Sequence, residues 1–261
     1  MKKLKITGIV LGSIYVLGCI GLYFFQDRII FRPQQLPKDY QFQTGEEVTI
    51  EVEDHIALNA IWIKEAPSKG VILYLHGNRG SIRRCLRQTG GMQGHGYDIF
   101  LPDYRGYGKS DGQIVSEAKL HTDAQKMYDF LKQHYREDQI IILGYSLGTG
   151  MATHLAANNN PQQLVLVAPY LSMLNLKNRW APFIPDFLVK YPLKSDRWIP
   201  QIKKPITLFH GTADNVIPYD SSEKLKELNP SFTRLITLQG ESHRGALFNH
   251  IFAQELKILL P

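Results

Sequence analysis

Cysteine is scarce in this sequence, with only Cys19 and Cys85 among 261 residues. Two cysteines cannot form a disulfide framework or a cluster of metal ligands, and they leave the redox compartment undetermined. The chain also lacks internal repeats, low-complexity segments and any long basic run interleaved with aromatic residues. Although the formal net charge is +6 at pH 7, the absence of such a run argues against nucleic-acid binding. We therefore expect no nucleic-acid partner and no bound metal.

The overall composition is that of a folded protein. Hydrophobic residues make up 44% of the chain and charged residues 21%, which excludes a disordered polymer. A length of 261 residues suits one sizeable domain with a large core. The moderate positive charge is also compatible with a position near an anionic membrane surface.

The N-terminal segment has the length and composition of a membrane span. Residues 6–25 carry no charge, and at about 1.5 Å per residue a helix over them measures about 30 Å, the thickness of a bilayer core. Lysines precede this stretch, which favours a cytoplasmic N-terminus, whereas Arg28 and Arg32 beyond it weaken that orientation. We expect residues 1–25 to form a single-pass anchor that leaves the rest of the chain periplasmic or lumenal.

Two other interpretations of this segment stay open. A cleaved secretory signal is one, although the apolar run is longer than usual and ends without a clear small-residue cleavage site. A lipoprotein signal is the other, because residues 16–19 resemble a lipobox in which Cys19 is lipidated. The sequence stays apolar from Cys19 to Phe25, where a mature lipoprotein would usually turn polar, so the anchor is favoured.

Residues 26–45 are expected to be a linker, and residues 46–261 a domain of alternating strands and helices. Val48 to Val52 and Ile56 to Trp62 alternate apolar and polar residues around a short turn, which predicts an antiparallel hairpin. Val71 to Leu75 is apolar throughout, as in a strand covered on both faces. Further strands are expected at 98–101, 140–143, 164–167, 206–209 and 235–238, and helices at 81–95, 116–135, 147–158, 221–228 and 245–260. This order predicts an α/β fold with a mostly parallel, doubly wound sheet.

A Gly-x-Ser-x-Gly motif follows the predicted strand at 140–143. Ser146 stands between Gly144 and Gly148, and small residues continue into the predicted helix. The pattern is typical of a cramped strand–turn–helix in which the serine hydroxyl is pushed above the sheet edge. The N–H of Leu147, at the start of the helix, is expected to point outward as a hydrogen-bond donor.

Asp214 and His243 follow two later strands, so both are expected at the same sheet edge as Ser146. A hydroxyl is a poor nucleophile until a histidine takes its proton, and an aspartate fixes the tautomer of that histidine and stabilises its charged form. Ser, Asp and His in this chain order predict nucleophilic catalysis. The loop that starts at His76, after the strand at 71–75, is expected to offer a second backbone N–H to a ligand above Ser146.

These motifs resemble those of the α/β-hydrolases, in particular the membrane-anchored group similar to the Bem46 proteins and the α/β-hydrolase-domain 13 and 17 enzymes. The matching motifs span Val71 to His243, and the resemblance extends over the chain from Gln26 on. It rests on the segments 76–78, 103–110, 144–148, 211–218 and 242–243. It implies Ser146 as nucleophile, Asp214 as acid and His243 as base, with the N–H groups of Asn78 and Leu147 as the oxyanion hole. It also implies hydrolysis of an ester, thioester or amide without a metal or cofactor.

Some residues near these motifs have a structural interpretation instead. The resemblance makes the segment that begins at Asp103 a structural turn, and His76 and His210 are expected to order their loops. Four arginines gather on the predicted helix at 81–95 and the loop before it: Arg79, Arg83, Arg84 and Arg87. The favoured interpretation is a solvated basic face, and the alternative is attraction of an anionic substrate or lipid head group.

Residues 170–204 interrupt the strand–helix alternation and are expected to form a short cap over Ser146. Their aromatic and proline content suits either an apolar pocket wall for an acyl chain or plain packing on the sheet. The sequence thus predicts a carboxylesterase acting on a small or lipid-like acyl ester. A thioesterase that removes lipid from protein cysteine, a peptidase and a non-catalytic membrane-tethered binding protein are the alternatives.

Overall fold

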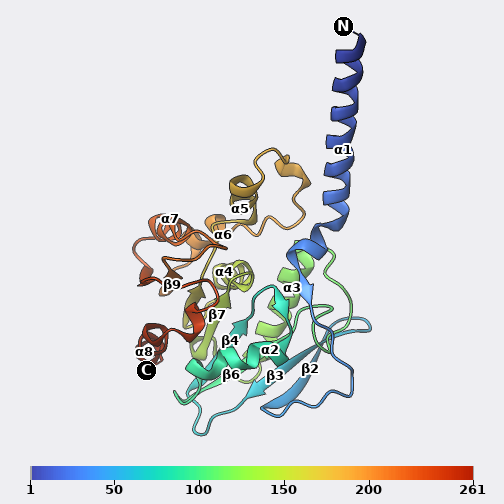
Figure 1. Cartoon of the computed structure of the whole chain (residues 1–261). Coiled ribbons are helices and arrows are strands. Elements are labelled where there is room, and N and C mark those ends of the chain that lie inside the picture. Colours follow the sequence, from blue (N-terminus) through green and yellow to red (C-terminus); the bar gives the residue numbers. More distant parts are fainter. Residues whose placement is uncertain (1, 261) are drawn as a thin grey trace.

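The computed structural model describes residues 2–260 and contains one eight-stranded sheet (Figure 1). The strand order is β10-β9-β8-β7-β4-β6-β3-β2. The strands are β2 (Glu46–Glu53), β3 (Ile56–Ile63), β4 (Gly70–Leu75), β6 (Tyr97–Pro102), β7 (Ile140–Tyr145), β8 (Gln163–Val167), β9 (Ile206–Gly211) and β10 (Thr233–Leu238). β2 pairs with β3 and β3 with β6 in antiparallel register, and all other pairs of this sheet are parallel. The predicted hairpin and the mostly parallel sheet are confirmed.

Helices cover both faces of the sheet because its central strands are apolar on both sides. Leu73 and Ile142 point into the core shared with α3 (Glu117–Lys132), α4 (Gly148–Asn158) and α7 (Asp220–Leu228). Their neighbours Ile72 and Leu143 point to the opposite core. That core is shared with α2 (Ile82–Cys85), η1 (Leu86–Met92), η5 (Ala246–Phe248) and α8 (His250–Leu259). Successive side chains of a strand point to opposite faces of the sheet, and apolar side chains recur about every 3.6 residues on one face of a helix. Helices therefore pack on both faces of the sheet, and the domain has three layers.

Two of the predicted helices are shorter and more irregular than the sequence pattern indicates. The predicted helix at 81–95 begins as α2 and continues only as a 3₁₀ segment, η1, which contains Gly90 and Gly91. Adjacent glycines weaken an α-helix because each loses more backbone entropy than other residues. The predicted helix at 245–260 is divided into η5 and α8, and Asn249 caps the second part by accepting the N–H of Ile251 at 2.9 Å.

Helix α1 (Lys2–Ile30) stands out from the body of the molecule and runs five residues beyond the expected end at Phe25 (Figure 1). It is the one helix among residues 2–260 that is long and apolar enough to cross a membrane.

The segment expected as a linker packs closely against the domain. Phe31 and Leu36 are buried in it. β1 (Arg32–Pro33) pairs in parallel with β5 (Arg79–Gly80), forming a second, two-stranded sheet. Phe31 and Leu36 are too few and too far apart to form a periodic apolar pattern, so the sequence does not predict that they are buried.

The segment expected as a cap, residues 170–204, lies above the C-terminal ends of the strands. It contains α5 (Met173–Trp180), η3 (Asp186–Leu188), α6 (Ser195–Trp198) and η4 (Ile199–Gln201). Its middle part, residues 183–190, lies beside α1 (Figure 1), so two segments far apart in the sequence meet on the same side of the sheet.

Candidate active site

Ser146 occupies a sharp turn between β7 and α4. Its φ of 52° lies in the left-handed region, which is unfavourable for a residue with a side chain and is retained only where the surroundings impose it. Here the strand and helix come so close that a Cβ on Gly148 would overlap the carbonyl oxygen of Leu75, and one on Gly144 would lie 2.7 Å from the Cβ of Ala152. The two glycines of the motif therefore permit the turn that exposes the serine hydroxyl.

The structure brings Ser146, His243 and Asp214 into one hydrogen-bonded chain. His243 Nε2 lies 2.9 Å from Ser146 Oγ, and His243 Nδ1 lies 2.7 Å from Asp214 Oδ2. Because a carboxylate only accepts hydrogen bonds, Nδ1 carries the proton and Nε2 is free to accept the serine O–H. The three residues follow β7, β9 and β10, whose parallel arrangement places their C-terminal ends at one edge.

The carboxylate of Asp214 is held by several donors besides His243. The backbone N–H groups of Val216 and Ile217 both donate to Oδ1 at 2.8 Å. Burial alone would raise the pKa of Asp214, but hydrogen bonds from His210 and His243 and the Ile217 N–H outweigh it and hold the pKa far below its usual value. Asp214 is thus an anion at neutral pH, as a partner of an imidazolium must be.

His210 is a second imidazole in contact with Asp214, a contact that the sequence does not reveal. Its Nε2 lies 3.3 Å from Asp214 Oδ2 and 3.0 Å from the carbonyl oxygen of Ile217. Both are acceptors, so Nε2 carries a proton and Nδ1 faces the Ser222 hydroxyl at 2.6 Å. His210 is fully buried and orders the loop, as predicted, and it also touches the carboxylate.

Asn78 and Leu147, the predicted backbone N–H donors, line the same cavity as Ser146. Within residues 2–260, neither N–H donates to another backbone group. The Asn78 loop is fixed from outside: its carbonyl accepts the Arg32 N–H at 2.9 Å and the Tyr107 hydroxyl at 2.8 Å, and its side chain donates to the Ile30 carbonyl at 2.9 Å. The end of α1 and the segment after it therefore help to position one of the two predicted oxyanion donors.

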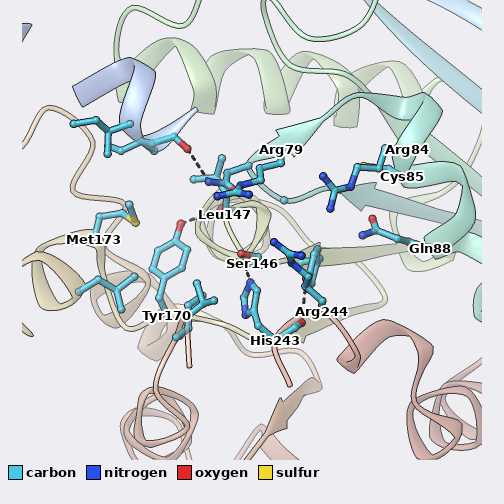
Figure 2. Close-up of a pocket in the computed structure, with 18 of the residues that line it drawn as sticks. Arg79, Arg84, Cys85, Gln88, Ser146, Leu147, Tyr170, Met173, His243 and Arg244 are labelled. Atoms are coloured by element: carbon cyan, nitrogen blue, oxygen red, sulfur yellow. Dashed lines mark hydrogen bonds between the residues drawn. The ribbon is translucent and has the colours of Figure 1, made fainter. Parts of the chain in front are cut away.

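A cavity of about 570 Å³ opens above Ser146 and has two unlike sides (Figure 2). Figure 2 shows Tyr170 and Met173 on one side of the serine and Arg84, Gln88 and Arg244 on the other. The apolar side is completed by residues of α1, α5 and the Asp214 loop: Ile29, Ile30, Leu176, Val216 and Ile217. The cavity has the size of a small-molecule site.

Four arginines line the cationic side, namely Arg79, Arg84, Arg87 and Arg244. No carboxylate lies within ion-pair distance of any of them among residues 2–260, and no Asp or Glu lines the cavity there. Arg83 differs from the others, because its guanidinium lies over the Tyr40 ring at 5.8 Å instead. Three of the four arginines that the sequence singles out thus face the site, and Arg244 joins them.

Other reactive side chains near the site have different surroundings. Cys85 lines the cavity, but burial raises the pKa of its thiol to about 12, so it is protonated and a poor nucleophile at neutral pH. Asp103 is buried, lies 3.2 Å from His76 Nε2 and accepts the Ile82 N–H at 2.9 Å. Asp103 and His76 thus order the loop below the site, as predicted. Residues 2–260 contain no cluster of three or more His, Cys, Asp or Glu side chains placed to hold a metal ion.

The sequence is similar to members of one hydrolase family. Residues 66–196 match the model of the family described as serine aminopeptidase, S33. Lysophosphatidylserine lipase ABHD12 of Danio rerio is 31% identical over 197 residues, which cover 66% of this chain and 51% of that protein. The chain therefore spans about half the length of that relative. WAV2 of Arabidopsis thaliana, an α/β-hydrolase domain-containing protein, is 29% identical over 237 residues, covering 79% of this chain and 76% of that protein.

Solved structures show the same fold at lower sequence identity. An esterase of Pyrococcus furiosus superposes with a TM-score of 0.67 at 20% identity, covering 88% of this chain and 96% of that one. A monoacylglycerol lipase of Paleococcus ferrophilus superposes with a TM-score of 0.60 at 18% identity, covering 77% of this chain and 98% of that one.

Proposed function

This chain belongs to the α/β-hydrolase family described as serine aminopeptidase, S33, and we propose that it cleaves carboxylic esters of lipid-like substrates through an acyl-enzyme intermediate. The observation that carries the proposal is the continuous chain Ser146 Oγ, His243 and Asp214 Oδ2, with hydrogen bonds of 2.9 and 2.7 Å. A non-catalytic binding protein has no need of this arrangement.

In the proposed mechanism His243 removes the proton of Ser146 as the hydroxyl attacks the ester carbonyl. The oxyanion that forms accepts the N–H groups of Asn78 and Leu147, and each such donor is worth about 3–4 kcal/mol in the transition state. Asp214 stabilises the imidazolium of His243. His243 then protonates the leaving alcohol, and in the second half of the reaction it activates the water that hydrolyses the acyl-enzyme.

The two sides of the cavity support an amphiphilic substrate. Apolar residues from α1 and α5 can bury an acyl chain, and each buried methylene contributes about 0.8 kcal/mol. The arginines opposite them, without carboxylate partners, can attract a negatively charged head group. We propose that the substrate is an anionic, acyl-chain ester, which agrees with the name of the Danio rerio relative, lysophosphatidylserine lipase ABHD12.

A peptidase is the second candidate, because the family takes its description from a serine aminopeptidase. An aminopeptidase binds a positively charged amino terminus, which a carboxylate would recognise. Four arginines and no lining carboxylate within residues 2–260 oppose that recognition. A thioesterase would use the same acyl transfer, so comparing matched oxygen and sulfur esters of one acyl chain separates it from an esterase.

We also propose that α1 is a single-pass anchor and that the catalytic domain lies outside the cytoplasm. The uncharged run from Ile6 to Phe25 and the preceding lysines support this orientation. Protease protection of the domain in sealed, right-side-out membrane vesicles would contradict it.

The first assay is turnover of p-nitrophenyl esters of increasing chain length by the full chain in detergent. We expect hydrolysis that rises with chain length until the cavity is filled. Aminoacyl p-nitroanilides are assayed in parallel to test for peptidase activity. The absence of turnover on every ester would overturn the proposal.

The proposed attraction of an anionic head group is tested by replacing both Arg84 and Arg244 with Gln. We expect kcat/KM for an anionic lysophospholipid to fall by roughly tenfold, since two exposed charge contacts of about 0.7 kcal/mol each are lost. The value for a neutral monoacylglycerol should change far less. Arg83→Gln is the matched control, because Arg83 lies outside the cavity. Equal losses on both substrates would show that the arginines do not recognise charge.

A further inference from the structure

The cap is attached to α1 at two levels of the helix. Near its end, Gln26 donates to the Leu188 carbonyl at 2.9 Å and accepts the Lys190 N–H at 2.9 Å, and Gln26 is buried. Farther up, the Tyr15 hydroxyl donates to the Phe183 carbonyl at 2.7 Å. The cap therefore lies along the lower half of α1, as Figure 1 also shows.

The upper contact fixes how far the cap reaches along the apolar run. Tyr15 is ten residues from Phe25, which at 1.5 Å per residue is about 15 Å along the helix. The run from Ile6 to Phe25 measures about 30 Å, so Phe183 is level with its middle. A helix that crosses the bilayer carries the tip of the cap into the leaflet on the catalytic side, less deeply if the helix is tilted.

The side chains at this tip suit a lipid environment. Trp180, Phe183 and Phe187 are 66, 68 and 83% exposed. Nearby charges are paired: Lys177 contacts Asp186 at 2.5 Å, and Lys190 lies 3.4 Å from Asp27 of α1. Aromatic residues are favoured at the boundary of head groups and acyl chains, and paired charges cost less there than single ones.

We infer that the cap tip, residues 180–188, is a second membrane contact, inserted beside α1 into the same leaflet. This inference rests on the proposed anchor. The occupant of the aromatic surface is the bilayer, because the surface is continuous with the apolar face of α1, and Tyr15 joins the two directly.

Insertion of the tip defines the route of the substrate. Ile29 and Ile30 of α1 and Met173 and Leu176 of α5 line the cavity, so its apolar side lies between the two membrane contacts. An acyl chain can move from the leaflet along α1 to Ser146 without crossing water. The cap then acts in substrate delivery rather than in the chemical step.

Fluorescence of Trp180 reports the position of the tip in the full chain reconstituted in phosphatidylcholine vesicles. The spectrum of the wild type minus that of Trp180→Phe isolates Trp180 from Trp62 and Trp198. We expect this component to be quenched by lipids brominated on the acyl chains and protected from aqueous iodide. Quenching by iodide and not by brominated lipid, or loss of the protein from the vesicles in a carbonate wash, would overturn the inference.

A kinetic comparison separates this inference from the proposed hydrolysis. Phe183→Gln with Phe187→Gln should raise KM for a lipid ester in vesicles by roughly tenfold, since two exposed aromatic side chains lose their lipid contact. Hydrolysis of p-nitrophenyl butyrate should stay unchanged, because neither side chain lines the cavity. Phe232→Gln is the matched control, because Phe232 is 41% exposed, directly precedes β10 and lies outside the cap tip.

The outcomes of that comparison are distinct. An unchanged KM for the vesicle substrate, or a shift equal to that of Phe232→Gln, contradicts insertion while leaving hydrolysis in place. Lipid quenching of Trp180 in a protein that hydrolyses neither ester supports insertion and rejects the proposed function. Vesicle-independent dimers that protect Trp180 from iodide would assign the aromatic surface to a second copy of the chain and overturn the inference.

Discussion

His210 holds the carboxylate of Asp214 from a buried position. Its Nε2 is 3.3 Å from Asp214 Oδ2, and its other nitrogen faces the Ser222 hydroxyl. The carboxylate must keep one orientation to fix the tautomer of His243. His210 is thus a positioning residue, which touches Asp214 but neither Ser146 nor the substrate cavity.

Replacing His210 with Ala should lower kcat by roughly tenfold to a hundredfold, if a residue that orients a carboxylate matters as much as one that orients a metal ligand. KM should change little, because the cavity wall is intact. His210→Gln keeps an N–H donor and should restore part of kcat. Steady-state kinetics on one soluble ester test this, and a KM effect without a kcat effect would contradict it.

The residues of the proposed triad are predictable from the sequence, and their neighbours are not. Ser146, Asp214 and His243 each follow an apolar strand, and parallel strands bring such positions to one edge. The contact of His210 with Asp214 depends on the path of the loop between them, which no periodicity encodes. Arg244 follows His243 directly, but its direction into the cavity depends on the turn before η5.

At the scale of elements, the turn between β7 and α4 determines the backbone geometry of Ser146. The approach of α4 to the end of β4 leaves no room for a Cβ on Gly148, because the Leu75 carbonyl oxygen occupies that space. Backbone atoms cannot move away as a flexible side chain can. The geometry of the proposed nucleophile therefore depends on a glycine two residues away.

We expect Gly148→Ala to destabilise the protein by about 1–3 kcal/mol, the usual cost of overpacking, and to lower activity by displacing Ser146. Gly90→Ala is the matched control, since a Cβ there meets nothing within 4 Å and its φ is not positive. Thermal unfolding with an activity assay compares the two. Equal stability of both variants would show that α4 can move away from β4 at little cost.

The sheet and most helices are predictable because each carries a clear period. The prediction of a long α-helix at 81–95 is wrong where two glycines occur, because η1 is a 3₁₀ segment rather than the second half of that helix. The extension of α1 to Ile30 is also not predicted. The charged residues from Asp27 onward mark the end of the apolar run, but the helix continues past them.

At the scale of the whole molecule, the segment after the apolar run is part of the α/β-hydrolase domain. Phe31 packs edge-on against Tyr191 of the cap with ring centroids 4.8 Å apart, and Leu36 is buried. Arg32 and Asn78 join the segment to the predicted oxyanion loop. The expected boundary at residue 45 thus separates residues that pack together.

Two truncations distinguish the membrane span from this packed segment. A chain that starts at Gln26 should keep kcat/KM on a soluble ester within about twofold, because Ile29 and Ile30 still line the cavity. A chain that starts at Glu46 should lose about 3 kcal/mol or more of stability, since burial of Phe31 and Leu36 contributes about 1.5–3 kcal/mol each. Denaturant unfolding measures the difference, and two equally stable truncations would contradict the packing argument.

Contacts at this scale escape sequence reasoning because they join distant segments without a pattern. Tyr15 and Phe183, for example, are 168 positions apart in the chain. An apolar run indicates that a helix can cross a membrane, but not which part of the domain lies beside it.

We propose above all that Ser146 is the nucleophile of a serine hydrolase. The most direct test treats the full chain with a fluorophosphonate probe and locates the label by peptide mass spectrometry. We predict one phosphonyl group per folded chain, on the peptide that contains Ser146, and none on Ser146→Ala or on heat-denatured protein. Labelling of Ser146→Ala to the wild-type extent, or of a different serine in the wild type, would contradict the account.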